Sequence, residues 1–210
     1  MIRILLVDDH PVVRYGIRQI LVDGLKSVSV GEASDGARAL ASIRTDEWDI
    51  VVLDVTLPGA SGLDVLKDIR RDYPSLPVLV LSMHPAAQFA RRALAAGASG
   101  YLTKDSAPTE LVSAIEEIRR GRRYLGARRT DTEPAPGRGG ADLLHDALSD
   151  REYQVLRMLG SGQTVSEIAA ALRLSVKTVS TYRIRLLEKL QMRSNAELMR
   201  YAIENGLVDS

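Results

Sequence analysis

Several apolar segments of this sequence end in side chains that could together carry out phosphoryl chemistry. Short runs typical of buried strands lead into Asp8-Asp9, Asp54, Ser82 and Lys104. The carboxyl ends of parallel strands lie at one edge of a sheet, and α/β proteins bind their ligands there. Three carboxylates, a hydroxyl and an ammonium at one such edge predict a metal-assisted phosphoryl site.

The chemistry of such a site follows from the charges of its members. Asp8, Asp9 and Asp54 would repel one another, and a divalent cation would relieve the repulsion; Mg²⁺ suits all-oxygen sites that include one or two carboxylates and a phosphate oxygen. A carboxylate can act as a nucleophile toward phosphorus, which forms an acyl phosphate. The metal and Lys104 would then neutralise charge on the transferring phosphoryl oxygens, to which Ser82 offers a hydroxyl.

Each of these residues also has a commoner structural explanation when it is taken alone. An aspartate after a strand often caps a helix, a strand-end serine is usually structural, and a loop lysine is usually solvated. His10 is expected to pack or cap rather than to bind metal. The pattern at four strand ends favours the site. A flavin phosphate is the other ligand such an edge could bind, but Asp8-Asp9-His10-Pro11 would repel a phosphate that lacks a metal.

The elements that must position these residues form an alternating pattern over residues 1–121. Apolar runs alternate with amphipathic helical patterns, which predicts a flavodoxin-like, doubly wound, five-stranded parallel sheet covered on both faces by right-handed crossovers. The order 2-1-3-4-5 would make the first and third strands neighbours. The predicted strands are residues 2–7, 28–33, 50–53, 78–82 and 99–103.

The remaining sequence divides into a linker and a small helical domain. Residues 122–147 are rich in Arg, Pro and Gly and cannot bury enough surface to fold alone. Residues 148–210 are expected to be helical throughout, with capping boxes that begin at Ser149, Thr164 and Ser194. Only three residues, Leu172 to Leu174, separate the second helix from the Ser175 start of the third, which predicts a helix-turn-helix. The predicted helices are residues 150–160, 165–171, 176–190 and 195–205.

Composition limits the class of protein. The chain has 210 residues and no cysteine, which excludes disulfides and thiolate zinc sites. No apolar run approaches the roughly 20 residues that cross a bilayer, and the N-terminus lacks a signal-peptide layout, so we expect a cytoplasmic protein with no membrane partner. Residues 148–210 carry 9 Lys and Arg against 7 Asp and Glu, a balance of +2 that weakly indicates a nucleic-acid partner.

The strand-end pattern resembles the receiver domain of two-component response regulators over about residues 1–121. The resemblance implies that Asp54 accepts a phosphoryl group from a sensor histidine kinase. It further implies that Asp8, Asp9 and Asp54 hold Mg²⁺ and that Lys104 pairs with the phosphoryl group.

The resemblance also implies a switch pair, in which the Ser82 hydroxyl turns toward the phosphate and the Tyr101 ring rotates inward behind it. Core packing is the alternative for Tyr101. Thr56 and His84 border the expected water path to Asp54.

The stretch from Leu148 to Leu207 resembles the LuxR-type helix-turn-helix of the NarL/FixJ group. Val176 and Val179 are expected to begin the inward stripe of the recognition helix. By resemblance, three of its residues face bases: Ser180, Thr181 and Ile184. Four others are candidates for contacts to the DNA backbone: Lys177, Tyr182, Arg183 and Arg185. The last helix resembles the dimerisation helix of the family, with core packing as the alternative, through Ala196, Leu198, Met199 and Ala202.

Together these features predict a transcription regulator rather than an enzyme. Phosphorylation of Asp54 is expected to promote homodimerisation and binding to double-stranded promoter DNA, and RNA polymerase is a further partner that such a regulator can have. Two alternatives remain. One is a phosphorylation-independent DNA binder with a vestigial receiver, and the other is a small phosphatase-like enzyme that uses Asp54 as its nucleophile.

Overall fold

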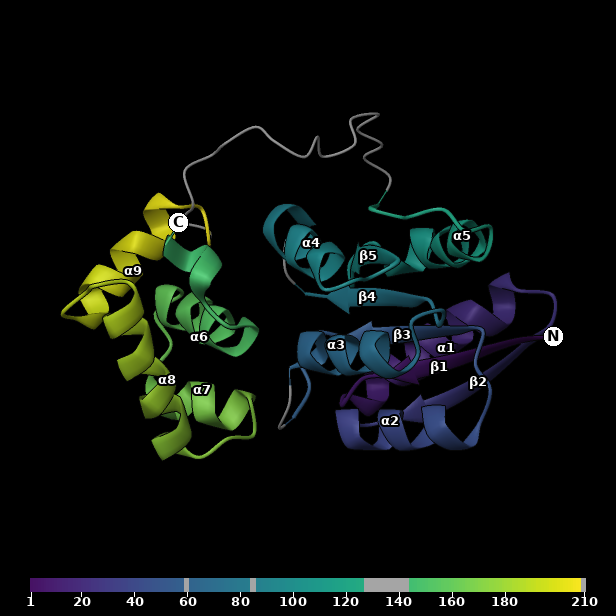
Figure 1. The fold of residues 1–210 in the computed structure, drawn as a ribbon, viewed down its shortest axis with the longest axis horizontal. Helices are drawn as coiled ribbons and strands as arrows, with labels where there is room; N and C mark the ends of the chain where they lie inside the picture. The colour runs from purple at the N-terminus through teal and green to yellow at the C-terminus, as the bar shows by residue number, and fades with distance from the viewer. Residues whose placement is uncertain (59–60, 84–85, 127–143, 209–210) are drawn as a thin grey trace. The chain divides into compact units, whose positions relative to one another are not determined.

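The computed structural model describes residues 1–58, 61–83, 86–126 and 144–208. It divides the chain into two compact units, residues 1–133 and 134–210 (Figure 1). Within the described part of the chain, no helix has the length and apolar character that a membrane span requires.

The first unit is a five-stranded parallel sheet with a helix after each strand. The strand order β2-β1-β3-β4-β5 confirms the predicted doubly wound topology. The strands are β1 (Ile2–Val7), β2 (Val28–Ala33), β3 (Ile50–Asp54), β4 (Val78–Ser82) and β5 (Gly100–Thr103). The helices are α1 (Pro11–Gly24), α2 (Gly36–Thr45), α3 (Gly62–Asp72), α4 (Ala86–Ala95) and α5 (Ala107–Arg119).

Both faces of this sheet are covered, which explains why its central strands are apolar without alternation. Helices α1 and α5 lie on one face, and α2, α3 and α4 lie on the other (Figure 1). On the first face, Ile4 and Val52 belong to one buried cluster with Leu21 and Ile115. Because side chains alternate along a strand, Leu53 points to the opposite face, and it is also fully buried.

The strand register brings the polar strand ends together. Val7 pairs with Leu53, so the residues that follow them, Asp8 and Asp54, lie beside each other at the edge of the sheet. At the next two strands, Ser82 pairs with Thr103 directly before Lys104. The sheet therefore delivers the side chains of four strands to one edge, as the sequence pattern predicts.

The second unit is helical, as predicted. A 3₁₀ turn, η1 (Leu144–Ala147), precedes α6 (Asp150–Gly160), α7 (Val165–Ala171), α8 (Val176–Lys189) and α9 (Asn195–Glu204). Reciprocal capping boxes begin α6 at Ser149 and α7 at Thr164. The third predicted box is wrong in one half: Ser194 accepts from the N–H of Glu197, but the Glu197 carboxylate accepts from the N–H of Arg193 instead.

Both ends of the segment assigned to a linker, residues 122–147, contact a folded unit. The carbonyl of Tyr124 accepts from the N–H of Tyr101 at 2.8 Å, and the Tyr124 hydroxyl donates to Glu110 at 3.0 Å. At the other end, the ring of His145 is buried, and its Nδ1 lies 2.9 Å from the Tyr201 hydroxyl. The middle of the segment, residues 127–143, lies outside the described residues.

The backbone near the edge leaves no room for a side chain at Gly62. A Cβ there would overlap the carbonyl oxygen of Asp54 and lie 2.8 Å from the Cα of Val55. We expect Gly62→Ala to lower the free energy of unfolding by about 1–3 kcal/mol or more, because backbone atoms must shift. Urea unfolding followed by the fluorescence of Trp48, the single tryptophan of the chain, reports on this unit.

Gly16→Ala is the matched control. Gly16 lies inside α1, and no atom lies within 4 Å of a Cβ built there. This variant should be stabilised by about 0.5–1 kcal/mol through helix propensity alone. Equal effects of the two substitutions would contradict the close contact between Gly62 and the end of β3.

Candidate functional site

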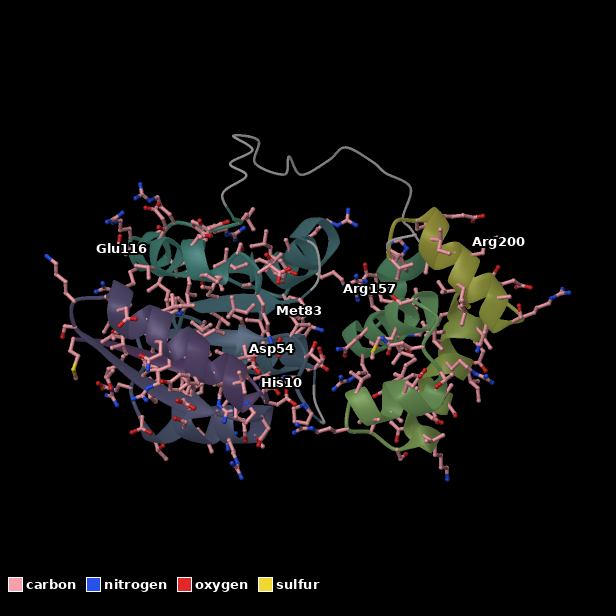
Figure 2. The ribbon with its side chains drawn as sticks, turned by 180° about the vertical axis from the view of Figure 1, so that it is seen from behind. His10, Asp54, Met83, Glu116, Arg157 and Arg200 are labelled. Carbon is pink, nitrogen blue, oxygen red and sulfur yellow. The ribbon has the colours of Figure 1, made fainter. Side chains whose placement is uncertain are left out.

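A single lysine bridges two of the three carboxylates at the sheet edge. The Nζ of Lys104 donates to Oδ2 of Asp8 at 2.6 Å and to Oδ2 of Asp54 at 2.8 Å. Both carboxylates are almost fully buried, and the lysine side chain is only 10% exposed. Figure 2 shows Asp54 at the same end of the sheet as His10 and Met83.

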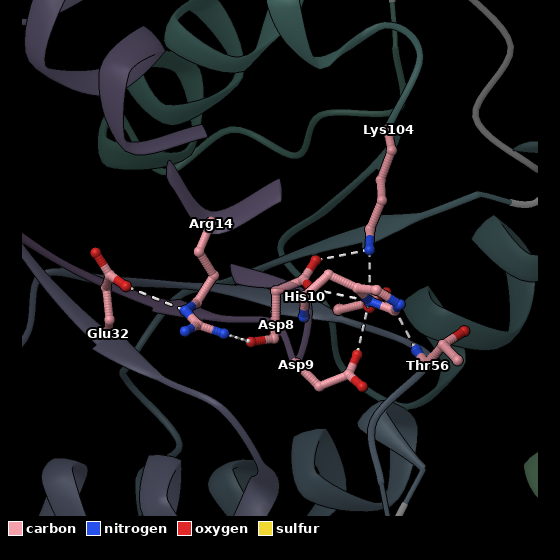
Figure 3. A network of polar contacts seen from close by, with 8 residues as sticks. Asp8, Asp9, His10, Arg14, Glu32, Thr56 and Lys104 are labelled. Carbon is pink, nitrogen blue, oxygen red and sulfur yellow. Dashed lines mark hydrogen bonds and ion pairs between the residues drawn. The ribbon is translucent and has the colours of Figure 1, made fainter. Parts of the chain in front are cut away.

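The other carboxylate oxygens are held by the loops that follow the strands. Oδ1 of Asp54 accepts from the N–H of Thr56 at 3.1 Å, and Oδ1 of Asp8 accepts from the N–H of His10 at 2.7 Å. The His10 ring lies 2.8 Å through Nδ1 from Oδ1 of Asp9 (Figure 3). His10 thus contacts the cluster with both its backbone and its ring, and its side chain is 58% exposed.

The donor set fits a hard divalent cation. One ligand atom from each of Asp8, Asp9, His10 and Asp54 lies within 4.8 Å of the others. If its groups are ionised, the cluster carries three negative carboxylates and one positive lysine, which leaves two negative charges. Carboxylate oxygens at this spacing suit Mg²⁺, which takes oxygen ligands and retains waters.

Burial makes ionisation of Asp54 costly. It raises the pKa of the Asp54 carboxyl from 3.8 to about 6; the Lys104 ammonium opposes the shift, and the negative charge of Asp8 adds to it. Burial alone would lower the pKa of Lys104, but the charges and hydrogen bonds of Asp54 and Asp8 raise it overall. The lysine is therefore a cation at neutral pH, and Asp54 is a carboxyl that is harder to ionise than a free one.

The two predicted switch residues are both buried. Ser82 is 0% exposed and Tyr101 is 1% exposed. The backbone joins the first of them to the site, because the carbonyl of Ser82 accepts from the N–H of Lys104 at 2.7 Å. Their motion stays a prediction. The other residue assigned to the water path, His84, lies outside the described residues.

A helix-turn-helix forms a second candidate site. Helices α7 and α8 are joined through residues 172–175, where Arg173 adopts φ +52° and the N–H of Leu174 donates to the carbonyl of Ala169 at 2.9 Å. Ser175 caps α8 by accepting from the N–H of Thr178. At the far end of α8, Lys189 donates to the buried Glu152 of α6 at 2.7 Å, which fixes the last turn of this helix.

The outer face of α8 carries most of the predicted DNA contacts. Lys177, Thr181, Ile184 and Arg185 are exposed, and the remaining three are half-buried: Ser180, Tyr182 and Arg183. The expectation that Val176 faces inward is wrong, since it is 52% exposed. The inward stripe begins almost one turn later, at the fully buried Val179.

The residues assigned to dimerisation separate into two groups. Leu198 and Ala202 are fully buried inside the helical unit, where a Cβ on Gly160 would meet Ala202 at 2.6 Å. These two residues therefore follow the alternative of core packing, and the role of α9 in dimerisation stays a prediction. Ala196 is exposed and Met199 is half-buried on the same helix.

Sequence reasoning missed Arg14 and Glu32. Nη1 of Arg14 donates to the carbonyl of Asp8 at 2.7 Å, and Nε donates to Glu32 on β2 at 3.0 Å. One signal was available: a cation near the start of a helix opposes the helix dipole and needs a local reason. Glu32 gave no signal, because its partner is set by tertiary structure.

Comparisons with known proteins match both units. A family model described as the response regulator receiver domain matches residues 4–116. A second, described as bacterial regulatory proteins of the luxR family, matches residues 146–202. The first covers more than half of the chain.

The similarity to other proteins extends over almost the whole of both chains. The transcriptional activator protein ExaE of Pseudomonas putida is 40% identical over 98% of this chain and 97% of its own. The response regulator UvrY of Escherichia coli K12 is 39% identical over 100% of this chain and 97% of its own. A solved structure of RcsB from Salmonella enterica serovar Typhimurium, bound to promoter rprA with the phosphomimetic BeF3-, is 29% identical with a TM-score of 0.64, over 96% of this chain and 98% of RcsB.

The raised pKa of Asp54 predicts a pH-dependent stability. Between pH 3.8 and about 6 the folded chain holds a proton at Asp54 that the unfolded chain has lost, so stability falls as pH rises through this window. Full ionisation costs up to about 3 kcal/mol. Asp54→Asn lacks this cost. In Mg²⁺-free buffer, the unfolding free energy of Asp54→Asn, measured by Trp48 fluorescence, should increase relative to that of the unsubstituted chain as pH rises from 4 to 7.

Asp64→Asn is the control for the loss of an exposed acidic group from the same unit. Asp64 lies in the first turn of α3, and its side chain is 51% exposed. Its difference from the unsubstituted chain should change little with pH. A difference for Asp54→Asn that is equally flat would contradict the raised pKa.

Proposed function

The chain belongs to the two-component response regulators that join a receiver domain to a LuxR-type DNA-binding domain, and on that premise we propose that its Asp54 accepts the regulatory phosphoryl group. The proteins of this family are transcription regulators, not enzymes. The observation that supports Asp54 is the bridge from Lys104 to Asp54 and Asp8 at 2.8 and 2.6 Å. It places a nucleophile and a counter-charge at one buried edge.

Asp8, Asp9 and Asp54 would hold Mg²⁺ in this proposal. Bound there, the cation would offset the two negative charges that the cluster leaves and polarise the phosphoryl oxygens. Asp9 and Asp54 lie at the ends of different strands, β1 and β3, so the ligands of the cation would come from two strand ends. The backbone N–H groups of His10 and Thr56 each hold one oxygen of the Asp8 and Asp54 carboxylates in place.

The phosphoryl step uses the oxygens of Asp54 directly. One carboxylate oxygen forms the new O–P bond as the N–P bond of a phosphohistidine on the sensor kinase breaks, and the histidine nitrogen leaves with the electron pair. Lys104 neutralises charge on the transferring oxygens. Its ion pair with Asp54 must loosen as the carboxylate becomes an acyl phosphate, and the lysine follows the charge to the phosphoryl group.

Ser82 and Tyr101 would convert this event into a change of surface. The phosphoryl group carries roughly −1.5 to −2 charge in place of the single negative charge of the carboxylate, and its oxygens favour rotation of the Ser82 hydroxyl toward them. Tyr101 then adjusts its position in the space behind Ser82. Both residues are buried, so a change in one must be accommodated by its neighbours.

The output is DNA binding through α8. Its exposed face offers Thr181 and Ile184 to base edges, with Ser180 beside them, while Lys177 and Arg185 hold phosphates. Tyr182 and Arg183 are half-buried candidates for further backbone contacts; the RcsB structure bound to a promoter supports this use of the fold.

Dimerisation and cellular context complete the proposal. Two copies would place two recognition helices about one DNA turn apart, with Ala196 and Met199 of α9 available for contact between them. The partners are then a sensor histidine kinase, promoter DNA and RNA polymerase, in the cytoplasm. We assign the receiver to residues 1–121 and the DNA-binding domain to residues 148–210, with a linker over residues 122–147.

Phosphorylation of the full chain tests the acceptor. With Mg²⁺ and acetyl phosphate, intact mass should show one added phosphoryl group, and Asp54→Asn should show none. Asp64→Asn should gain the group as the unsubstituted chain does. An equal gain in Asp54→Asn would place the acceptor elsewhere, and no gain in the unsubstituted chain would favour a vestigial receiver.

Lys177 tests the DNA contact. Binding to a random-sequence duplex should depend on salt through phosphate contacts alone, and Lys177→Met should reduce the slope of log affinity against log salt by about 0.9. Arg200→Met is the control, because Arg200 lies on α9 with a 72% exposed side chain and should leave the slope unchanged. An unchanged slope for Lys177→Met would remove Lys177 from the interface.

A further inference from the structure

Arg14 joins the acidic loop to the neighbouring strand. Its side chain is 15% exposed, and it spans from the carbonyl oxygen of Asp8 to the carboxylate of Glu32 on β2. In Figure 3, Arg14 reaches the backbone of Asp8, whereas Lys104 reaches its carboxylate. The two cations therefore hold the same residue through different groups.

The peptide between Asp8 and Asp9 must turn the side chains of two successive residues toward the same cluster. Successive side chains of an extended strand point to opposite faces of the sheet, yet Asp8 and Asp9 both contribute to one cluster with ligand atoms within 4.8 Å. Strand β1 ends at Val7, and the chain bends at Asp9. The plane of the peptide between the two aspartates sets the direction of the second side chain relative to the first.

Three hydrogen bonds hold the N–H and the carboxylate of Asp8. Its N–H donates to the carbonyl of Ala33 at 3.2 Å, its Oδ1 accepts from the N–H of His10, and its Oδ2 accepts from Lys104. None of them acts on the carbonyl oxygen, which lies in the plane of the peptide that leads to Asp9. The bond from Arg14 at 2.7 Å does.

We propose that Arg14 is a positioning residue that orients the Asp8-Asp9 peptide so that both carboxylates face one divalent cation. The inference depends on the Mg²⁺ site proposed above. The guanidinium suits this task because its planar fork donates from Nη1 and Nε to two fixed acceptors at once, which a lysine ammonium on a flexible stem does not reproduce. Glu32 holds the fork in place from β2.

The sign of the effect on Mg²⁺ affinity separates positioning from plain electrostatics. Removal of a positive charge near a cation site should tighten Mg²⁺ binding if charge alone mattered. If Arg14 positions the ligands, Arg14→Met should weaken it, by about tenfold as for other groups that orient metal ligands. Titration calorimetry with MgCl₂ on the full chain measures this without phosphorylation or DNA.

Arg18→Met is the matched control. Arg18 lies one turn along α1 and reaches the same Glu32 at 4.0 Å, and its side chain is 50% exposed. This variant removes the same charge but no bond to Asp8, so Mg²⁺ affinity should stay unchanged or rise slightly. Glu32→Gln removes the charge that holds the fork and should weaken Mg²⁺ binding less than Arg14→Met does.

Arg14→Lys is a second variant for the case in which Arg14→Met does not fold. It keeps the charge and most of the stem, and Trp48 fluorescence shows whether the unit remains folded. This variant should also bind Mg²⁺ more weakly than the unsubstituted chain. Unchanged or tighter binding in folded Arg14→Met and Arg14→Lys would overturn the positioning role, whereas absence of Mg²⁺ binding by the unsubstituted chain would overturn the proposed metal site itself.

Discussion

The double ion pair of Lys104 is the contact around which the receiver site is organised. It joins the loop after β5 to the ends of β1 and β3, at 2.6 Å to Asp8 and 2.8 Å to Asp54. Buried charges are costly unless they are well paired, and this lysine pairs two of them. When all four groups are ionised, two negative charges remain in the cluster, which suits the divalent cation proposed for this edge. A phosphoryl group on Asp54 changes the same balance.

The strand β5 links this charge balance to the chain beyond the receiver. Lys104 follows it, Tyr101 lies within it, and the N–H of Tyr101 donates to the carbonyl of Tyr124. Gly100 permits this approach, since a Cβ there would lie 2.8 Å from the same carbonyl oxygen. A residue assigned to the switch and the start of the connecting segment therefore share a backbone hydrogen bond. The site and the start of the connecting segment are therefore both joined to β5.

Much of this arrangement could be predicted from the sequence, because it follows from periodicity and strand ends. Buried runs such as Ile50–Leu53 locate the strands, and the parallel topology then brings Asp8 beside Asp54. Contacts set by packing could not be predicted in this way. Val176 looked like part of an apolar stripe, but the first turn of α8 is exposed. The sequence left both an interface and a core role open for Leu198, and its side chain is fully buried in the core. Arg14 carries no motif, because its role comes from one backbone carbonyl brought near by the fold.

Control of DNA binding by the receiver can be measured with the full chain and one DNA duplex. The dissociation constant for a duplex selected from genomic DNA would be determined in Mg²⁺ with and without beryllofluoride, a stable mimic of the phosphoryl group. Loading of Asp54 would be followed in parallel through the loss of its reactivity toward acetyl phosphate. We expect tighter binding when the receiver is loaded, and no such gain in Asp54→Asn. The same dissociation constant with a fully loaded receiver would contradict a phosphorylation-controlled regulator.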